Sequence, residues 1–266
     1  MAVNRSHPEP QAMPALNDAQ SKQTAKHLAR QSKLVKQYYA RVPFDDICHR
    51  SPKELSAAAM SHWNMASKRK SDESLVRIYN PSAKNDGWES QNTIIEITTT
   101  DKPFLVRSMS LAISKFGFSI STFIHPIFHV ARKKNGQLEG MVSESHKDAI
   151  AESFKQLHVD KQYGESSFDQ IKQVISEAIT NINLECDDWE PMKNACAAAV
   201  DRLRATNPNK FEIAEAADFI KWLQRYYFTF TGYAELQTSG KTARVTKAHG
   251  IFPGRQTAGH AQQVHT

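Results

Sequence analysis

The chain has 266 residues, a hydrophobic content of 40% and a net charge of +6. This length can hold one large or two modest domains with their own cores, and no apolar run approaches the roughly 20 residues that a membrane span requires. The net charge excludes few classes of protein, because residues 1–42 carry +5 of it and the rest of the chain is nearly neutral. A basic isoelectric point of this origin describes one segment and gives no general signature of nucleic-acid binding.

Cysteine usage and the start of the chain indicate a compartment. Cys48, Cys186 and Cys196 form no C-x-x-C pair and leave one cysteine over. This favours reduced thiols in a cytoplasmic protein over a disulfide framework. No apolar segment follows the first basic residues, so we expect no secretory signal and no membrane association.

The first 50 residues are predicted to form a tail and a basic helical arm. Residues 1–17 contain three prolines and few apolar side chains, which predicts disorder. An apolar stripe interrupted by Ser32 predicts a helix over 18–41, which Pro43 ends. Its basic face suits either a docked helix with solvated cations or a phosphate-binding arm. The first is favoured, because few aromatic residues are interleaved with the cations and no glycine-rich loop accompanies them.

The next segment carries clear local signals. Ser51 precedes Pro52 and Glu54, a capping box that predicts a helix start. Residues 75–79 read as a short strand closed by Asn80-Pro81. Asp86-Gly87 then marks a turn.

Residues 92–136 are the part around which the chain is organised. Alternation from Thr93 to Thr98 predicts a strand with one face better buried than the other. Asp101 and Pro103 predict a helix start with Asp101 as the N-cap, and Gly117 its end. Residues 118–131 read as extended, and Asn135-Gly136 favours a two-residue hairpin.

The C-terminal half reads as a strand, three helices and a hairpin. The periodicity predicts a strand over 154–160 and helices over 168–182, 189–203 and 210–226, with 184–188 between the first two helices. Residues 228–238 and 241–249 are predicted to pair as a hairpin that packs on the third helix, exposes an unpaired edge and favours self-association. The last stretch, 253–266, has little to bury and is expected to be a disordered tail.

The sequence offers no catalytic, cofactor-binding or metal residues. It contains no G-x-G-x-x-G, G-x-x-x-x-G-K, G-x-S-x-G or H-E-x-x-H motif. His125 and His129, joined by His158 or Asp160, could form a metal site if the strand were regular. Pro126 indicates an edge or a bulge there, so packing histidines are the favoured interpretation.

The turn of Thr100, Asp101, Pro103 and Phe104 is the candidate site, because amides at a helix start attract carboxylates and phosphates. D-K-P at a β-α junction, a helix ending in F-G and the following strand resemble an ACT domain. That resemblance implies a βαββαβ module that binds amino acids in many metabolic enzymes. Ligand-binding ACT domains usually carry glycine after this proline. The bulky Phe104 therefore favours a structural role over an amino-acid effector site.

Residues 34–252 resemble the N-terminal region of the large bacterial NAD-specific glutamate dehydrogenases. The stretches that carry the resemblance occur in the family's order: Ser51-Pro52, Ser61-His62-Trp63, Val76-Arg77-Ile78-Tyr79-Asn80-Pro81, Gly87-Trp88, Asp101-x-Pro103-Phe104-Leu105-Val106, Ser108, His125-Pro126 and Phe228-Thr229-Phe230-x-Gly232-Tyr233. Lys155 departs from the pattern, since it falls where the family is apolar, so the strand around it is expected to be an edge or frayed.

The resemblance implies tandem ACT-like units ahead of a catalytic domain with its own Rossmann fold, NAD and catalytic lysine. The expected fold is α+β: an ACT-like, ferredoxin-like unit over 51–183, a helical connector over 184–227 and the start of a second unit over 228–252. The implied function is a regulatory or assembly portion of the dehydrogenase, truncated before its catalytic domain and inactive alone. The alternative is a free-standing amino-acid sensor or a weak nucleic-acid binder. Expected partners are the remainder of the dehydrogenase or a second copy, with nucleic acid disfavoured.

Overall fold

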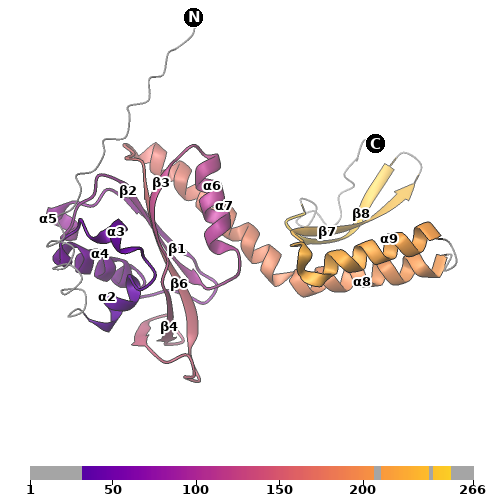
Figure 1. The fold of residues 1–266 in the computed structure, drawn as a ribbon, viewed down its shortest axis with the longest axis horizontal. Helices are drawn as coiled ribbons and strands as arrows, with labels where there is room; N and C mark the ends of the chain where they lie inside the picture. The colour runs from indigo at the N-terminus through magenta and orange to yellow at the C-terminus, as the bar shows by residue number, and fades with distance from the viewer. Residues whose placement is uncertain (1–31, 207–210, 240–241, 253–266) are drawn as a thin grey trace, which may run out of the picture. The chain divides into compact units, whose positions relative to one another are not determined.

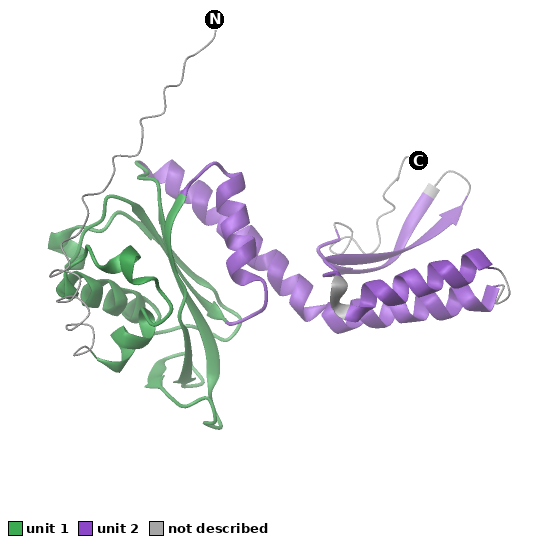
Figure 2. Cartoon of the chain, in the orientation of Figure 1, with its two compact units in different colours: residues 1–100, 120–163 green, residues 101–119, 164–266 purple. Residues whose placement is uncertain are grey.

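The structure, a computed structural model, describes residues 32–206, 211–239 and 242–252 (Figure 1). It divides into two compact units (Figure 2): unit 1, residues 1–100 and 120–163, and unit 2, residues 101–119 and 164–266. The domain boundaries expected from the sequence stay predictions, and the compact units divide the chain at other residues. No helix of the described segments is long and apolar enough to cross a membrane.

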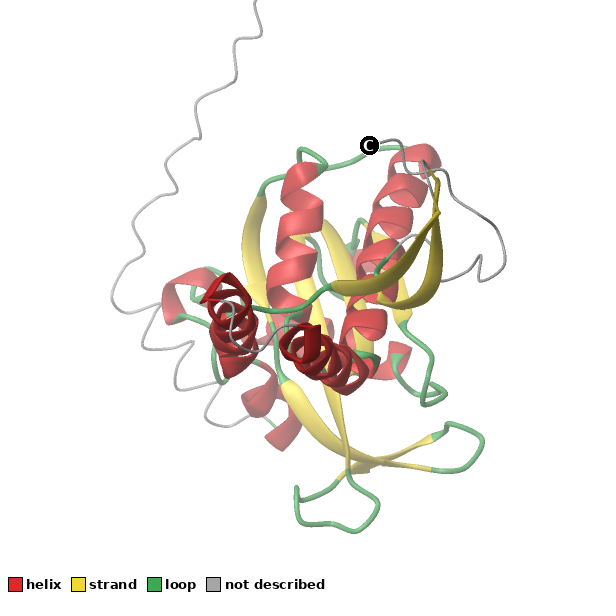
Figure 3. Ribbon diagram, turned by 90° about the vertical axis from the view of Figure 1, so that its right-hand side faces the viewer, coloured by secondary structure: helices red, strands yellow, loops and turns green. Residues whose placement is uncertain are grey.

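Unit 1 is built on a six-stranded antiparallel sheet, whose strands are drawn in yellow in Figure 3. The strand order is β1 (Leu75–Tyr79), β2 (Thr93–Thr100), β6 (Ile150–Val159), β4 (Ile127–Arg132) and β5 (Leu138–Met141), and β3 (Ile120–Ile124) also pairs with β6. The mixed α+β, ACT-like class expected from the sequence is confirmed. In a βαββαβ unit the last strand follows the second helix. Here the outer strand beside β2 is β1, which comes from upstream in the chain.

Helices of unit 1 cover one face of this sheet. They are α2 (Lys33–Tyr38), α3 (Phe44–Ile47) and α4 (Pro52–Met65), with the short α5 (Ala83–Asp86) following β1. The capping box at Ser51 and Glu54 is present as predicted. The shared core contains Val35, Tyr38, Tyr39, Ile47, Leu55, Ala59, Ala66, Ile124, Phe128, Val130 and Phe154. Burial of these side chains supplies the main driving force for folding of unit 1.

The single helix expected over 18–41 is wrong in its described part. Helix α2 begins at Lys33, and the Ser32 hydroxyl caps it by accepting a hydrogen bond from the Val35 amide at 3.4 Å. The serine that interrupts the apolar stripe is therefore a helix start. Residues 1–31, which carry the expected tail and the first part of the basic arm, lie outside the described residues.

Two expectations about the central strands are also wrong. Both faces of β2 are buried, including Glu96 and Thr98, because their polar groups have hydrogen-bond partners. Strand β6 is neither an edge nor frayed, because it pairs with β2 on one side and with β3 and β4 on the other. Lys155 is fully buried, with its ammonium 2.5 Å from the Ser153 hydroxyl. A polar residue can occupy such a position when its head group has a partner.

The extended stretch 118–131 breaks at His125-Pro126, which separates β3 from β4, as proline at a strand interruption predicts. The hairpin between β4 and β5 is longer than the expected two-residue turn. The Gly136 amide bonds to the Lys133 carbonyl at 2.8 Å, and Gly136 alone in this turn has positive φ, +86°. A Cβ on Gly136 would lie 2.5 Å from the Arg69 carbonyl oxygen, so this glycine is required for close approach as well.

Unit 2 contains the remaining helices and a two-stranded sheet. They are α6 (Leu105–Lys115), α7 (Glu165–Asp187), α8 (Trp189–Thr206), α9 (Phe211–Trp222), the π-helical turn η1 (Leu223–Tyr227), β7 (Gly232–Ser239) and β8 (Thr242–Gly250). Helix α6 packs on α7, and α8 packs on α9. The expected helix-free stretch 184–188 is wrong, because α7 continues to Asp187 and only Asp188 separates it from α8.

The hairpin β7–β8 forms as expected but packs chiefly against α7 and α8 rather than α9. Asp188 explains this difference. Its carboxylate accepts a hydrogen bond from the Gly250 amide at 2.6 Å and lies 3.7 Å from the His249 ring, so it ties the end of β8 to the junction of the two helices.

Candidate functional site

The candidate turn Thr100, Asp101, Pro103 and Phe104 does not begin the helix as predicted. Helix α6 starts at Leu105, and its N-cap is Phe104 instead of Asp101. The hydroxyl of Thr100 is engaged in unit 1, where it donates to the Ser71 carbonyl at 3.1 Å and accepts from Arg69 at 3.2 Å. The turn therefore offers no capping carboxylate at the start of α6.

Phe104 has an unusual backbone conformation. Its φ of +67° and ψ of −8° place it in the left-handed region, and among the described residues it is the one non-glycine with positive φ. A bulky side chain in this region costs about 1 kcal/mol or more. Its side chain is 47% exposed, although it is a large aromatic group. The backbone geometry explains why glycine suits this position in ligand-binding ACT domains.

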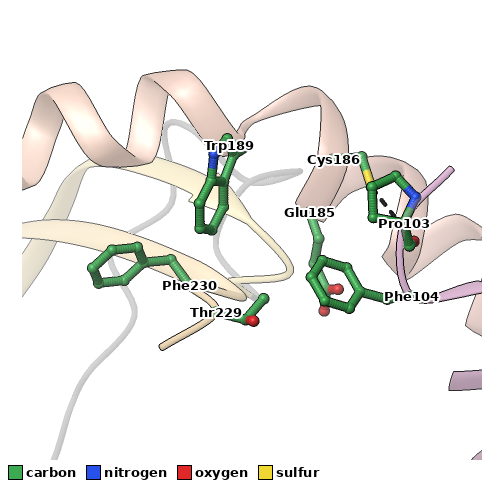
Figure 4. A pocket seen from close by; sticks show the side chains of 7 residues that line it. All are labelled: Pro103, Phe104, Glu185, Cys186, Trp189, Thr229 and Phe230. Atoms are coloured by element: carbon green, nitrogen blue, oxygen red, sulfur yellow. Dashed lines mark hydrogen bonds between the residues drawn. The ribbon is translucent and has the colours of Figure 1, made fainter. Parts of the chain in front are cut away.

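A pocket of about 280 Å³ lies beside this turn within unit 2 (Figure 4). The lining residues come from the turn, the end of α7, the start of α8 and the segment before β7: Pro103, Phe104, Glu185, Cys186, Trp189, Thr229 and Phe230. Phe104 and Glu185 line one side, and Trp189, Thr229 and Phe230 line the other (Figure 4). The rings of Trp189 and Phe230 lie 6.1 Å apart, within the range of a favourable aromatic pair.

Burial shifts the pKa values of two polar groups of this pocket in the direction that favours the neutral form. Burial raises the pKa of the Glu185 carboxyl, and burial also raises the pKa of the Cys186 thiol. The Cys186 thiol points to the Pro103 carbonyl at 4.0 Å. Cys186 is thus a free, weakly acidic thiol, unlike the electropositive setting of a reactive cysteine. The pocket suits an apolar group.

No cation lines this pocket among the described residues. Lys102 is the nearest in sequence, and its ammonium forms an ion pair with Asp187 at 2.8 Å. An α-carboxylate would have to rely on backbone amides and the Thr229 hydroxyl. Two of the four candidate residues, Pro103 and Phe104, therefore line the pocket, while the chemistry expected of an amino-acid site is weak.

Sequence reasoning missed the residues that complete the pocket. The sequence pattern places Glu185 and Cys186 between two helices and Trp189 at the start of a helix, and neither placement indicates a pocket. The Phe228-Thr229-Phe230 run is the one signal that could have pointed here, because it combines aromatic residues with a period of two. Its proximity to the turn at 101–104 follows only from the packing of α6, α7 and the hairpin.

A second arrangement of polar groups lies on the face of the unit 1 sheet beneath α4. The buried carboxylate of Glu96 accepts hydrogen bonds from Arg77, Tyr79 and Gln156, those from the latter two at 3.1 and 3.0 Å. The Ser61 hydroxyl, 2.8 Å from the Arg77 guanidinium, adds a partner from α4. These side chains come from the stretches that carry the family resemblance or pair with them.

The second buried carboxylate of this face is Glu152. It bonds to Arg69 at 2.7 Å and to Arg132 at 2.6 Å, and all three side chains are almost completely buried. His62 bonds to Tyr38 at 2.7 Å and to Thr98 at 3.2 Å. Removing one member of such a buried network leaves the others without a partner, which is costly. The network therefore favours the one packing of α4 on the sheet in which all of these bonds form.

The histidines considered for metal binding are not gathered. His125 lies at the break between β3 and β4, where its Nε2 is 2.6 Å from the Ser153 hydroxyl. His158 lies on the α4 side and bonds to Arg50 and Gln156. Burial lowers the pKa of His125 to about 4 and that of His158 to about 3. In the segments that the structure describes, no three histidine, cysteine, aspartate or glutamate side chains lie together as a metal site.

Comparison with known proteins gives consistent matches. The family model of the glutamate dehydrogenase ACT1 domain matches residues 34–175. An NAD-specific glutamate dehydrogenase of Halomonas elongata is 29% identical over 205 residues, which cover 75% of this chain and 13% of that protein. An NAD-specific glutamate dehydrogenase of Pseudomonas aeruginosa is 27% identical over 221 residues, covering 80% of this chain and 14% of that protein. The chain thus spans about one seventh of the length of these relatives.

Proposed function

Because the chain belongs to the glutamate dehydrogenase ACT1-domain family, we propose that it acts as an N-terminal assembly and regulatory part of an NAD-specific glutamate dehydrogenase. The observation that supports an assembly role is the pocket beside α6. Its lining is dominated by Pro103, Phe104, Trp189 and Phe230 and contains no cation among the described residues. Aromatic pockets of this kind suit an apolar side chain from a neighbouring protein segment.

Exposed aromatic residues elsewhere in unit 2 support the same role. Phe211, Phe219, Trp222 and Phe228 are 78%, 58%, 42% and 52% exposed. The hairpin adds Leu236, 48% exposed, on a sheet of only two strands. Apolar surface left in contact with water is typical of a surface that another protein part covers.

We further propose that the chain is catalytically incomplete. Oxidation of glutamate with NAD requires a dinucleotide cradle, and the sequence holds no G-x-G-x-x-G motif. NAD and glutamate would then bind to another part of the dehydrogenase, in the cytoplasm. A free-standing amino-acid sensor stays an alternative, although Phe104 and the lack of a lining cation disfavour it. Of the cations of the alternative nucleic-acid arm, Lys22, Lys26 and Arg30 lie outside the described residues.

The test is to add the purified chain to the Pseudomonas aeruginosa relative from which the matching region has been removed. We expect no glutamate-dependent NADH formation by the chain alone, and co-elution of the two proteins in size-exclusion chromatography. Phe104→Ala and Trp189→Ala should each weaken that association about tenfold, the usual effect of losing an aromatic anchor.

Leu111→Ala is the matched control, because Leu111 is 52% exposed on α6 and does not line the pocket. Its association should stay unchanged. NADH formation by the chain alone would refute catalytic incompleteness. Association that is lost equally in all three variants, or in none, would refute the assembly role of the pocket.

A further inference from the structure

A polar pocket of about 510 Å³ lies in unit 1, at the end of the sheet where β1 and β6 end and β2 begins. Cationic and neutral groups on its lining are Arg50, Lys161, Asn92 and Ser82, and its acidic groups are Glu54 and Glu89. Arg50 comes from the α3–α4 connection, whereas Lys161 and Asn92 come from the ends of two neighbouring strands. The tertiary fold alone brings these residues together.

Arg50 is held in an unusual setting for a cation. Its guanidinium lies over the Trp88 ring, 5.3 Å from the centroid, and one of its amino groups is 3.1 Å from Nδ1 of His158. Within the described residues the guanidinium forms no other hydrogen bond, and no carboxylate lies within 4.0 Å of it. A guanidinium has five N–H donors, so most of them have no protein acceptor.

No carboxylate in the described part of the chain is hydrogen-bonded to Arg50, and the Glu54 carboxylate attracts its charge only from a distance. His158 accepts from Arg50 as a neutral ring, since burial lowers its pKa to about 3. Burial likewise lowers the pKa of Arg50 below its usual range. A partly buried cation is normally paired or hydrogen-bonded, because desolvation of an isolated charge is costly. The free donors of Arg50 therefore define a place for a negatively charged group.

The acidic residues at the rim do not fill that place. The carboxylate of Glu54 is engaged at the start of α4, where it accepts from the Ser51 amide at 2.9 Å and the Ser51 hydroxyl at 2.7 Å. Glu89 is exposed. Lys161 is anchored on the Ser90 carbonyl at 2.8 Å and provides a second cation in the pocket without a described carboxylate partner.

We propose that this pocket binds a small carboxylate-bearing metabolite, with Arg50 as the anchor and Lys161 as the second cation. The fork of a guanidinium matches the two oxygens of a carboxylate. Each carboxylate group carries a single charge, so it fits a rim that also carries Glu54 and Glu89 better than a phosphate, which concentrates up to two charges on one group. The site differs from the pocket beside α6 and does not depend on the proposed assembly role.

The experiment is an NMR titration of the full chain labelled with ¹⁵N. Acetate and glutarate are the probes, and inorganic phosphate and ethylammonium are the contrasts. We expect saturable shifts of the Trp88 indole and the Asn92 side-chain amide with the two carboxylates. Arg50→Gln should weaken glutarate binding about tenfold and Lys161→Gln about threefold, as expected for lost charge-assisted hydrogen bonds.

Lys68→Gln is the matched control, since it removes one exposed positive charge outside the pocket and should leave binding unchanged. Because Arg50 also braces Trp88 and His158, its variant must retain the dispersed spectrum of the folded chain. Lys161→Gln provides the test if it does not. Absence of carboxylate shifts, stronger binding of phosphate, or equal weakening by Lys161→Gln and Lys68→Gln would overturn the proposal.

Discussion

The buried face of the unit 1 sheet and the pocket of unit 2 differ in the side chains that they contain. The first is rich in paired polar groups, and the second is mainly aromatic. Beneath α4, the carboxylates of Glu96 and Glu152 are buried, and each has two or more cationic or hydroxyl partners. Beside α6, the pocket presents aromatic rings and one carboxyl, Glu185, whose pKa burial raises. The polar groups of the first region have their partners within its own unit, whereas the second region has the apolar lining on which the proposed assembly role rests.

The largest expected effect is on the buried ion pairs of unit 1. Glu152→Gln keeps the side-chain volume but leaves Arg69 and Arg132 buried without a counter-charge. The free energy of unfolding of unit 1 should fall by about 3–5 kcal/mol, measured by urea denaturation. Glu139→Gln, on an exposed position of β5, is the control and should change it by less than about 0.5 kcal/mol. Equal effects of the two would show that the buried network is not needed for stability.

Acid should weaken unit 1 through its buried histidines. Burial lowers the pKa of His62 to about 4 in the folded state, against about 6.5 when unfolded, so the folded protein holds His62 neutral. The resulting stability is present above about pH 6.5 and is lost as the pH falls toward 4, by up to about 3 kcal/mol. His62→Gln should flatten this pH dependence in urea titrations. The exposed His146→Gln should leave it unchanged, and an unaltered slope in His62→Gln would contradict the prediction.

The next largest loss of stability is expected at the β4–β5 turn, where Gly136 is closely packed. In Gly136→Ala, the new Cβ would meet the Arg69 carbonyl, the backbone of a residue that holds Glu152. We expect a loss of about 2–3 kcal/mol in the free energy of unfolding. Gly140→Ala on β5 is the control, because Gly140 also has positive φ, +148°, but no heavy atom lies within 4 Å of its Cβ position. A loss as large in Gly140→Ala would show that backbone strain alone accounts for the effect.

Two variants of Phe104 test whether the backbone of the turn before α6 is strained. Phe104→Gly should be more stable than Phe104→Ala by about 1 kcal/mol, because φ of +67° is strained for alanine and not for glycine. Thermal or urea unfolding of both variants measures the difference. At most positions the order is reversed, so alanine being the more stable variant here would show that the turn relaxes to negative φ.

The smallest expected effect is at the edge of the same turn. The ion pair between Lys102 and Asp187 is partly solvated, with Asp187 65% exposed. Lys102→Gln should therefore lower stability by less than about 0.5 kcal/mol, and added salt should remove the difference. A loss above about 2 kcal/mol would mean that this pair, like those of unit 1, is a structural element.

Much of the local structure could be predicted from the sequence because its signals are short-range. The capping box of Ser51 and Glu54, the strand closed by Asn80-Pro81 and the break at Pro126 depend on residues a few positions apart. The same kind of evidence gave the α+β class and the rare-residue stretches that resemble the glutamate dehydrogenase family. Local signals gave wrong predictions where the same residues are compatible with two local structures. Ser32 starts a helix instead of interrupting one, and Asp101 does not cap the helix that follows it.

What the tertiary structure decided is which polar side chains are buried and which aromatic ones are not. Glu96 is buried because Arg77 and Tyr79 on β1 and Gln156 on β6 bond to its carboxylate. Lys155 is expected on an edge or frayed strand and is buried because β6 is an inner strand of the sheet. The pocket of Phe104 with Trp189 likewise joins residues about 85 positions apart. Alternation along a strand determines which face a side chain occupies. What covers that face depends on partners that alternation does not encode.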